Sequence, residues 1–117
     1  MGKLTTHVLD AAHGCPGASI VIELYRIEGA QMLKVASAVT NSDGRCDAPL
    51  LQDDEYRSGV YQLHFHAGDY YRARGAVLNE PAFLDVVVLR FGIDAGQAHF
   101  HVPLLISPYS YSTYRGS

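Results

Sequence analysis

His99-Phe100-His101-Val102-Pro103-Leu104-Leu105-Ile106-Ser107 is the stretch of sequence that decides the fold. Its even positions are all apolar, whereas its odd positions mix histidine, proline, leucine and serine. This period of two predicts a β-strand whose even face lies in the core between two sheets. Pro103 has no N–H for a sheet ladder, so the strand is expected at an edge or paired on one side there. The odd face is expected to be covered by another subunit.

The same alternation recurs on both sides of this strand. Further strands are expected over residues 4–11, 18–27, 33–40, 59–66, 83–91 and 109–114, with a less regular segment over 49–55. The apolar run 83–91 is expected to be buried on both faces. A short helix is expected over residues 69–74, with Asp69 capping its start and Gly75 its end. Seven or eight short strands with turns at intervals of roughly 8–12 residues predict an all-β, antiparallel β-sandwich.

Length and composition exclude several classes of protein. The chain has 117 residues, which predicts a single domain over residues 1–117. Its formal net charge of −3 argues against a general nucleic-acid binder. No apolar run is long enough to span a membrane, and no export signal is recognisable at the start, so a cytoplasmic location is expected. Cys15 and Cys46 are expected to be free thiols.

Three features outside the core pattern indicate chemistry. His7 lies on the semi-polar face of the first strand, together with Thr5 and Leu9. The segment Asn41-Ser42-Asp43-Gly44-Arg45 predicts a tight turn with an arginine at its exit. The chain ends in Tyr114-Arg115-Gly116-Ser117, residue types that suit planar, hydrogen-bonding ligands and close backbone approach. Such an ending is expected to lie in a site.

Three stretches resemble the 5-hydroxyisourate hydrolases, the transthyretin-related enzymes of urate breakdown. They are residues 4–10 with Gly14-Cys15-Pro16-Gly17-Ala18 behind them, residues 40–45, and residues 99–109 continuing through 114–117. The resemblance covers essentially the whole chain. The related hormone carrier transthyretin has lysine at the position of His7 and threonine at that of His101, and it lacks the Tyr-Arg-Gly-Ser ending.

The resemblance implies a fold, an assembly and a reaction. The implied fold is two four-stranded sheets with one short helix, and the implied assembly is a homotetramer, a dimer of dimers with active sites in the channel between dimers. The reaction is hydrolysis of the N1–C6 amide bond of 5-hydroxyisourate to 2-oxo-4-hydroxy-4-carboxy-5-ureidoimidazoline, without a cofactor or metal. Periplasmic and peroxisomal members of the family leave those two compartments open.

The site residues that carry over are His7, Arg45, His101, Tyr114 and Ser117. His7 and His101 are expected to activate water and return the proton, in an order that the sequence leaves open. Arg45 is expected to bind the heterocycle through its planar fork. Ser117 is expected to position a histidine or the water, rather than to form an acyl-enzyme, and Tyr114 to pack against the ring. His99 shares the strand face of His101 and is a second candidate of lower weight.

Alternative functions stay open at this point. A transthyretin-like carrier would bind a small aromatic ligand without turning it over, and an immunoglobulin-like module would only bind partners. The pairs His64/His66 and His99/His101 could each hold zinc or copper, but no third ligand with clear spacing accompanies either pair, so no metal is expected.

Overall fold

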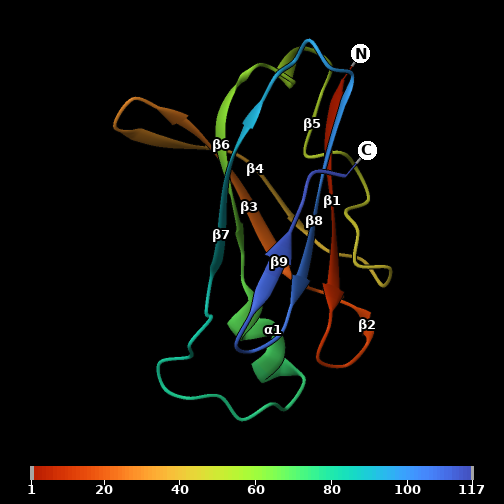
Figure 1. The fold of residues 1–117 in the computed structure, drawn as a ribbon, viewed down its shortest axis with the longest axis vertical. Helices are drawn as coiled ribbons and strands as arrows, with labels where there is room; N and C mark the ends of the chain where they lie inside the picture. Colours follow the sequence, from red (N-terminus) through yellow and green to blue (C-terminus); the bar gives the residue numbers. More distant parts are fainter. Residues whose placement is uncertain (1, 117) are drawn as a thin grey trace.

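The computed structural model describes residues 2–116, which contain nine strands and one α-helix (Figure 1). The strands are β1 (Lys3–Asp10), β2 (Cys15–Pro16), β3 (Val21–Glu28), β4 (Gln31–Val39), β5 (Leu51–Gln52), β6 (Gly59–Phe65), β7 (Val87–Ile93), β8 (His99–Ile106) and β9 (Tyr111–Thr113). The helix is α1 (Ala67–Ala73), and a 3₁₀ turn covers Asp53–Glu55. Each segment predicted as a strand overlaps an observed strand, which confirms the all-β class. No helix in residues 2–116 has the length and apolar character needed to span a membrane.

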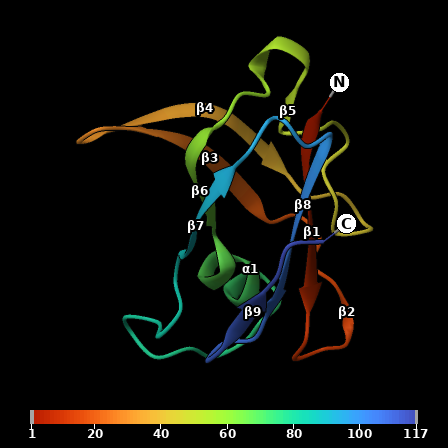
Figure 2. The same cartoon turned by 45° about the horizontal axis from the view of Figure 1, so that its top comes forward.

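The strands form two sheets that face each other, with α1 at one end (Figures 1 and 2). One sheet has the order β2-β1-β8-β9, with β5 also paired to β1, and the other has the order β4-β3-β6-β7. All pairings are antiparallel except that of β1 with β8, which run parallel along their whole length. The predicted β-sandwich is therefore confirmed, with β5 as an additional strand on the first sheet.

Strand β8 has the predicted core face. Its even residues Phe100, Val102, Leu104 and Ile106 are all buried. It is not an edge strand, but Pro103 lies just beyond the last pair of the β8–β9 ladder, and its carbonyl oxygen accepts a hydrogen bond from Thr113 Oγ1 at 2.7 Å. The missing N–H of Pro103 therefore falls where β9 ends. This agrees with the second of the two expectations, that the strand is paired on one side at this position.

The prediction for residues 83–91 is wrong in its boundaries and in its burial. Strand β7 begins at Val87, and along it buried residues alternate with exposed ones such as Val88 and Arg90. The cause is that β7 belongs to one of two sheets that face each other, so one face of the strand packs on the core and the other faces outward. An apolar sequence alone does not distinguish this arrangement from a strand that is covered on both faces.

The predicted helix is present but starts two residues earlier than expected. His66 is its N-cap residue, so the prediction that Asp69 caps the start is wrong, and Asp69 lies inside the first turn. A tertiary contact explains the earlier start, because the main-chain N–H of Gly68 donates a hydrogen bond to the main-chain oxygen of Asp85 at 2.8 Å. The predicted role of Gly75 is confirmed, since it follows the helix with a φ of +87°.

A buried carboxylate ties the end of β1 to α1. Asp10 is 1% exposed. It accepts hydrogen bonds of 2.7 Å from the hydroxyls of Tyr70 and Tyr71 and from Nδ1 of His13. Burial alone would raise the pKa of this carboxyl group, but these hydrogen bonds outweigh burial and lower it. The ionised form of Asp10 therefore stabilises the folded state.

We expect the substitution Asp10→Asn to lower the free energy of unfolding at pH 7 by about 3 kcal/mol, because hydrogen bonds to a buried charge are lost. The folded-state pKa lies below the unfolded value of about 3.9. The stabilisation is thus fully present above that value and disappears as the pH falls through the folded-state pKa. Urea unfolding from neutral to acidic pH measures both effects. The exposed Asp54→Asn is the matched control, and equal stability of Asp10→Asn and wild type at pH 7 would contradict the assignment.

Candidate active site

The parallel pairing of β1 and β8 collects the predicted site residues on one outer face. The register pairs Lys3 with His99, Thr5 with His101, and His7 with Pro103. Burial alternates along β1, and the intervening residues Leu4 and Val8 lie in the hydrophobic core. Paired residues on neighbouring strands share a face, so imidazole, hydroxyl and ammonium groups from the two strands lie together on the side away from the core.

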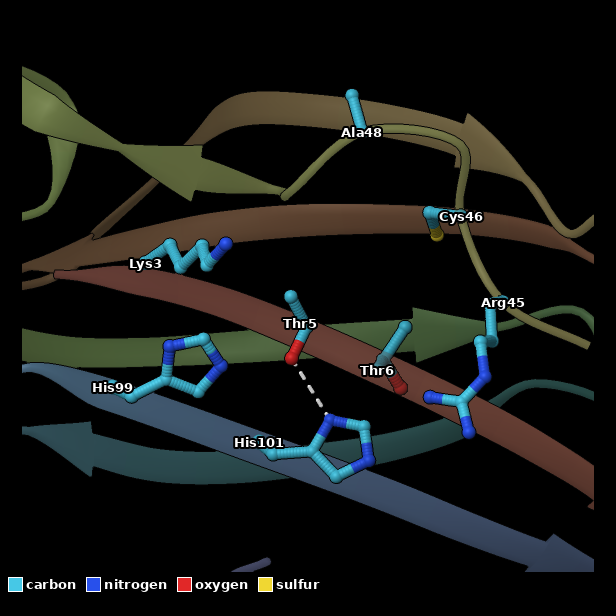
Figure 3. A pocket seen from close by; sticks show the side chains of 8 residues that line it. All are labelled: Lys3, Thr5, Thr6, Arg45, Cys46, Ala48, His99 and His101. Atoms are coloured by element: carbon cyan, nitrogen blue, oxygen red, sulfur yellow. Dashed lines mark hydrogen bonds between the residues drawn. The ribbon is translucent and has the colours of Figure 1, made fainter. Parts of the chain in front are cut away.

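A cavity of about 360 Å³ opens on this face (Figure 3). Its lining residues are Lys3, Thr5, Thr6, Arg45, Cys46, Ala48, His99 and His101. They include the basic side chains of Lys3 and Arg45 and two imidazoles, and no carboxylate. A cavity with this lining favours a polar ligand of negative charge.

A tight turn brings Arg45 to the cavity, as the sequence predicts. Asn41 Oδ1 accepts hydrogen bonds from the main-chain N–H groups of Asp43 at 2.9 Å and Arg45 at 3.2 Å. Gly44 has a φ of +78°, and its carbonyl oxygen accepts a hydrogen bond of 2.8 Å from the N–H of Val8. A Cβ at Gly44 would collide with the carbonyl oxygen of Val8. Glycine is therefore required for the turn to dock on β1, which places Arg45 opposite His7 in an isolated bridge.

The guanidinium of Arg45 points toward His101 (Figure 3). Its Nε donates to Oδ2 of Asp43 at 3.0 Å, which fixes the orientation of the group. Within residues 2–116 its two terminal nitrogens make no hydrogen bond. Arg45 can therefore present these nitrogens as a planar fork to a ligand in the cavity.

His7 lies beside the cavity rather than in its lining. Its Nε2 is 2.9 Å from the main-chain oxygen of Asp43, in the same turn that carries Arg45. A carbonyl oxygen can only accept a hydrogen bond, so Nε2 carries the proton. In the neutral ring this leaves Nδ1 of His7 as the basic nitrogen.

His101 lines the cavity and is held through one of its ring nitrogens. Its Nδ1 is 2.8 Å from Oγ1 of Thr5, and the other ring nitrogen lies on the side of Arg45 (Figure 3). Burial lowers the pKa of His101, and the positive charge of Arg45 and the neighbouring imidazoles of His7 and His99 lower it further. His101 is therefore neutral at pH 7, the form that can accept a proton from water.

The structure brings together only some of the residues predicted for the site. Arg45, His99 and His101 line one cavity, with His7 next to it. Tyr114 instead lines a groove of about 410 Å³ between β7 and β9. Ser117 lies outside the described residues, so its predicted role stays a prediction.

Sequence reasoning missed Lys3, Thr5 and Cys46. Thr5 was recognised as a neighbour of His7 on the same strand face, but its contact with His101 depends on pairing across 96 positions of sequence. The thiol of Cys46 is free, as is that of Cys15, and burial raises the pKa of Cys46. Among residues 2–116, no cluster of three or more His, Cys, Asp or Glu side chains could hold a metal ion.

We expect Arg45→Ala to raise the pKa of His101 toward its ordinary value, because the substitution removes a positive charge that disfavours the imidazolium. A pH titration of the His101 ring signals by NMR measures this change. Arg57→Ala removes a charge of the same kind from an exposed position outside the cavity and is the control. An unchanged or lower pKa in Arg45→Ala would show that Arg45 does not act on His101.

The chain is similar in sequence and structure to 5-hydroxyisourate hydrolases and to transthyretin. The family model for the HIUase/Transthyretin family matches residues 4–116. The 5-hydroxyisourate hydrolase of Pseudomonas aeruginosa is 71% identical over 117 residues, which are 100% of this chain and 93% of the relative. The solved 5-hydroxyisourate hydrolase of Klebsiella pneumoniae is 34% identical with a TM-score of 0.82, and the match covers 100% of both chains. Sea bream transthyretin in complex with thyroxine is 25% identical with a TM-score of 0.88, over 97% of this chain and 94% of that one. This chain belongs to the HIUase/Transthyretin family.

Proposed function

We propose that this protein hydrolyses the N1–C6 amide bond of 5-hydroxyisourate to give 2-oxo-4-hydroxy-4-carboxy-5-ureidoimidazoline, a step of urate degradation. The observation that carries the proposal is the environment of His101, an imidazole with a lowered pKa that lies beside Arg45 in a cavity without carboxylates. The 71% identity to a relative named 5-hydroxyisourate hydrolase supports the choice of substrate.

The chemistry requires a base, a charge-binding group and an acid. In the proposed mechanism, neutral His101 accepts a proton from water as the water oxygen attacks C6. Arg45 binds the heterocycle and stabilises the negative charge that develops on the C6 oxygen. As the C6–N1 bond breaks, N1 takes up a proton. His7 is the second imidazole proposed to take part in this proton transfer. Each acid–base role is worth roughly 10²–10⁴-fold in rate.

The proposed roles of Tyr114 and Ser117 require the assembled protein. Tyr114 is 62% exposed and faces a groove other than the cavity. Its proposed contact with the substrate ring therefore requires a second copy of the chain to bring it to a site. Ser117 is proposed to position a histidine or the water, as the resemblance implies.

We propose a homotetramer, a dimer of dimers, as the active form. Two observations support further assembly. Among the described residues, β7 and β9 end their sheets with unpaired edges, where Val88 and Tyr111 are exposed. An unpaired edge favours pairing with another chain. The outer face of β1 and β8 carries the half-buried apolar residues Leu9 and Leu105 beside the histidines. We also propose a cytoplasmic location, which the free thiols of Cys15 and Cys46 support.

A transthyretin-like carrier is the alternative function. The TM-score of 0.88 with a transthyretin–thyroxine complex favours it. A carrier, however, has no need of an imidazole with a lowered pKa that faces a cationic cavity. Turnover of 5-hydroxyisourate distinguishes the two functions directly.

We expect the protein to accelerate the ultraviolet absorbance decay of freshly prepared 5-hydroxyisourate above its spontaneous rate. His101→Ala and His7→Ala should each lower this activity by at least about tenfold, because each removes a proton-transfer group. Gel filtration of the variants is the control for intact assembly. Decay at the spontaneous rate with wild type would exclude the enzyme, and near-normal turnover in both variants would remove the acid–base roles.

Residues added after Ser117 should impair catalysis. Gly116 forms a bridge with His101, so the chain end is already at the strand that carries the proposed base. The measurement compares kcat of the native protein with that of a protein carrying a short Gly-Ser extension at the C-terminus. The same extension at the N-terminus is the control, and full activity of the C-terminal extension would contradict a role for the chain end.

A further inference from the structure

The C-terminal segment stays in register with β8 beyond the end of β9. The ladder pairs Ile106 with Tyr111 and Leu104 with Thr113, and the next recorded bridge joins His101 to Gly116. The N–H of Gly116 donates to the carbonyl oxygen of His101 at 2.7 Å. Residues 114–116 thus extend the sheet up to the strand position that carries the proposed base.

Gly116 lies directly against the side chain of His101. A Cβ added at this glycine would be 2.7 Å from Cδ2 and 3.2 Å from Cβ of His101. The first distance is shorter than van der Waals contact permits. The backbone of the segment therefore forms part of the wall that holds the His101 ring, and a displacement of the segment would loosen that wall.

The side chain of Arg115 also holds this segment to β8. Its guanidinium carbon lies 4.2 Å from the centroid of the Phe100 ring, within the range of a cation–π interaction. One of its terminal nitrogens donates to Oε1 of Gln97, and the same nitrogen donates to the carbonyl oxygen of His99 at 3.3 Å. All three partners lie within β8 or just before it, so one guanidinium holds the segment to the strand of His101.

The contacts of Arg115 are directed to the protein rather than to the cavity. It is not among the residues that line the cavity of His101. No carboxylate in residues 2–116 forms an ion pair with it. Arg115 does line the groove between β7 and β9, together with Tyr114, and the planar group that its guanidinium faces is the ring of Phe100.

We propose that Arg115 is a positioning residue for the reaction, one that clamps the C-terminal segment on β8 and thereby holds Gly116 against His101. This inference rests on the proposed function, because it assigns Arg115 an effect on the catalytic histidine. Lysine cannot replace arginine fully here, since its ammonium lacks the flat face that stacks on an aromatic ring.

The test compares Arg115→Ala and Arg115→Lys with wild type in the full-length protein. We expect Arg115→Ala to lower kcat by about 10- to 100-fold with little change in KM, because a misplacement of about 1 Å at a catalytic group can cost about 100-fold. Arg115→Lys should recover only part of this loss. Arg57→Ala, an exposed arginine outside this region, should leave kcat unchanged.

A second readout does not depend on turnover. Hydrogen exchange of the Gly116 amide, followed by NMR, reports the hydrogen bond to His101 directly. We expect slow exchange in wild type and in Arg57→Ala, and faster exchange in both Arg115 variants. Gln97→Ala removes one acceptor of the clamp while the stacking on Phe100 remains. It should accelerate the exchange to a smaller extent, and it keeps the test valid if Arg115→Ala does not fold.

The outcomes separate this inference from the proposed function. If wild type does not accelerate the decay of 5-hydroxyisourate, the proposed function fails, and Gly116 exchange still decides whether Arg115 clamps the segment. If wild type is active but Arg115→Ala retains its kcat, Arg115 is not a positioning residue. Unchanged Gly116 exchange in Arg115→Lys and Gln97→Ala overturns the clamp itself.

Discussion

The parallel pairing of β1 with β8 is the interaction on which the candidate site depends. Its register sets Thr5 beside His101, and the two side chains meet at 2.8 Å. Because side chains alternate along a strand, a slip of one residue in either strand would turn its histidine into the core. The buried even residues of both strands oppose such a slip, since they would be forced to the surface. The hydrophobic core therefore fixes the geometry of the polar face.

The two outer edges of this strand pair complete the site. Three segments pair in succession with the side of β1 that faces away from β8: β2, the turn of residues 41–45, and β5. The turn brings Arg45 to His7. On the other side of β8, the C-terminal segment brings Gly116 to His101. Four segments of the chain thus meet through main-chain hydrogen bonds of one sheet: β1, the turn of residues 41–45, β8 and the C-terminal segment.

Local sequence patterns predicted much of the fold because they depend on local physics. The alternation in β1 and β8 predicted which residues are buried, and Asn41 and Gly44 predicted the turn that carries Arg45. The resemblance to a family predicted His7, Arg45 and His101 as site residues, and the structure places Arg45 and His101 in one cavity with His7 beside it. The patterns failed where tertiary contacts decide, as at the start of α1 and along the exposed face of β7. No local signal contains the parallel pairing, which is why the contact of Thr5 with His101 was missed.

A crystal structure with a stable, oxidised purine such as urate bound to the protein tests the central claim most directly. The account predicts ligand density over the outer face of β1 and β8, with the guanidinium of Arg45 on the carbonyl oxygens of the ligand and His101 within hydrogen-bonding distance of the six-membered ring. Ligand density confined to the groove between β7 and β9, with His101 and Arg45 free of contact, would contradict it.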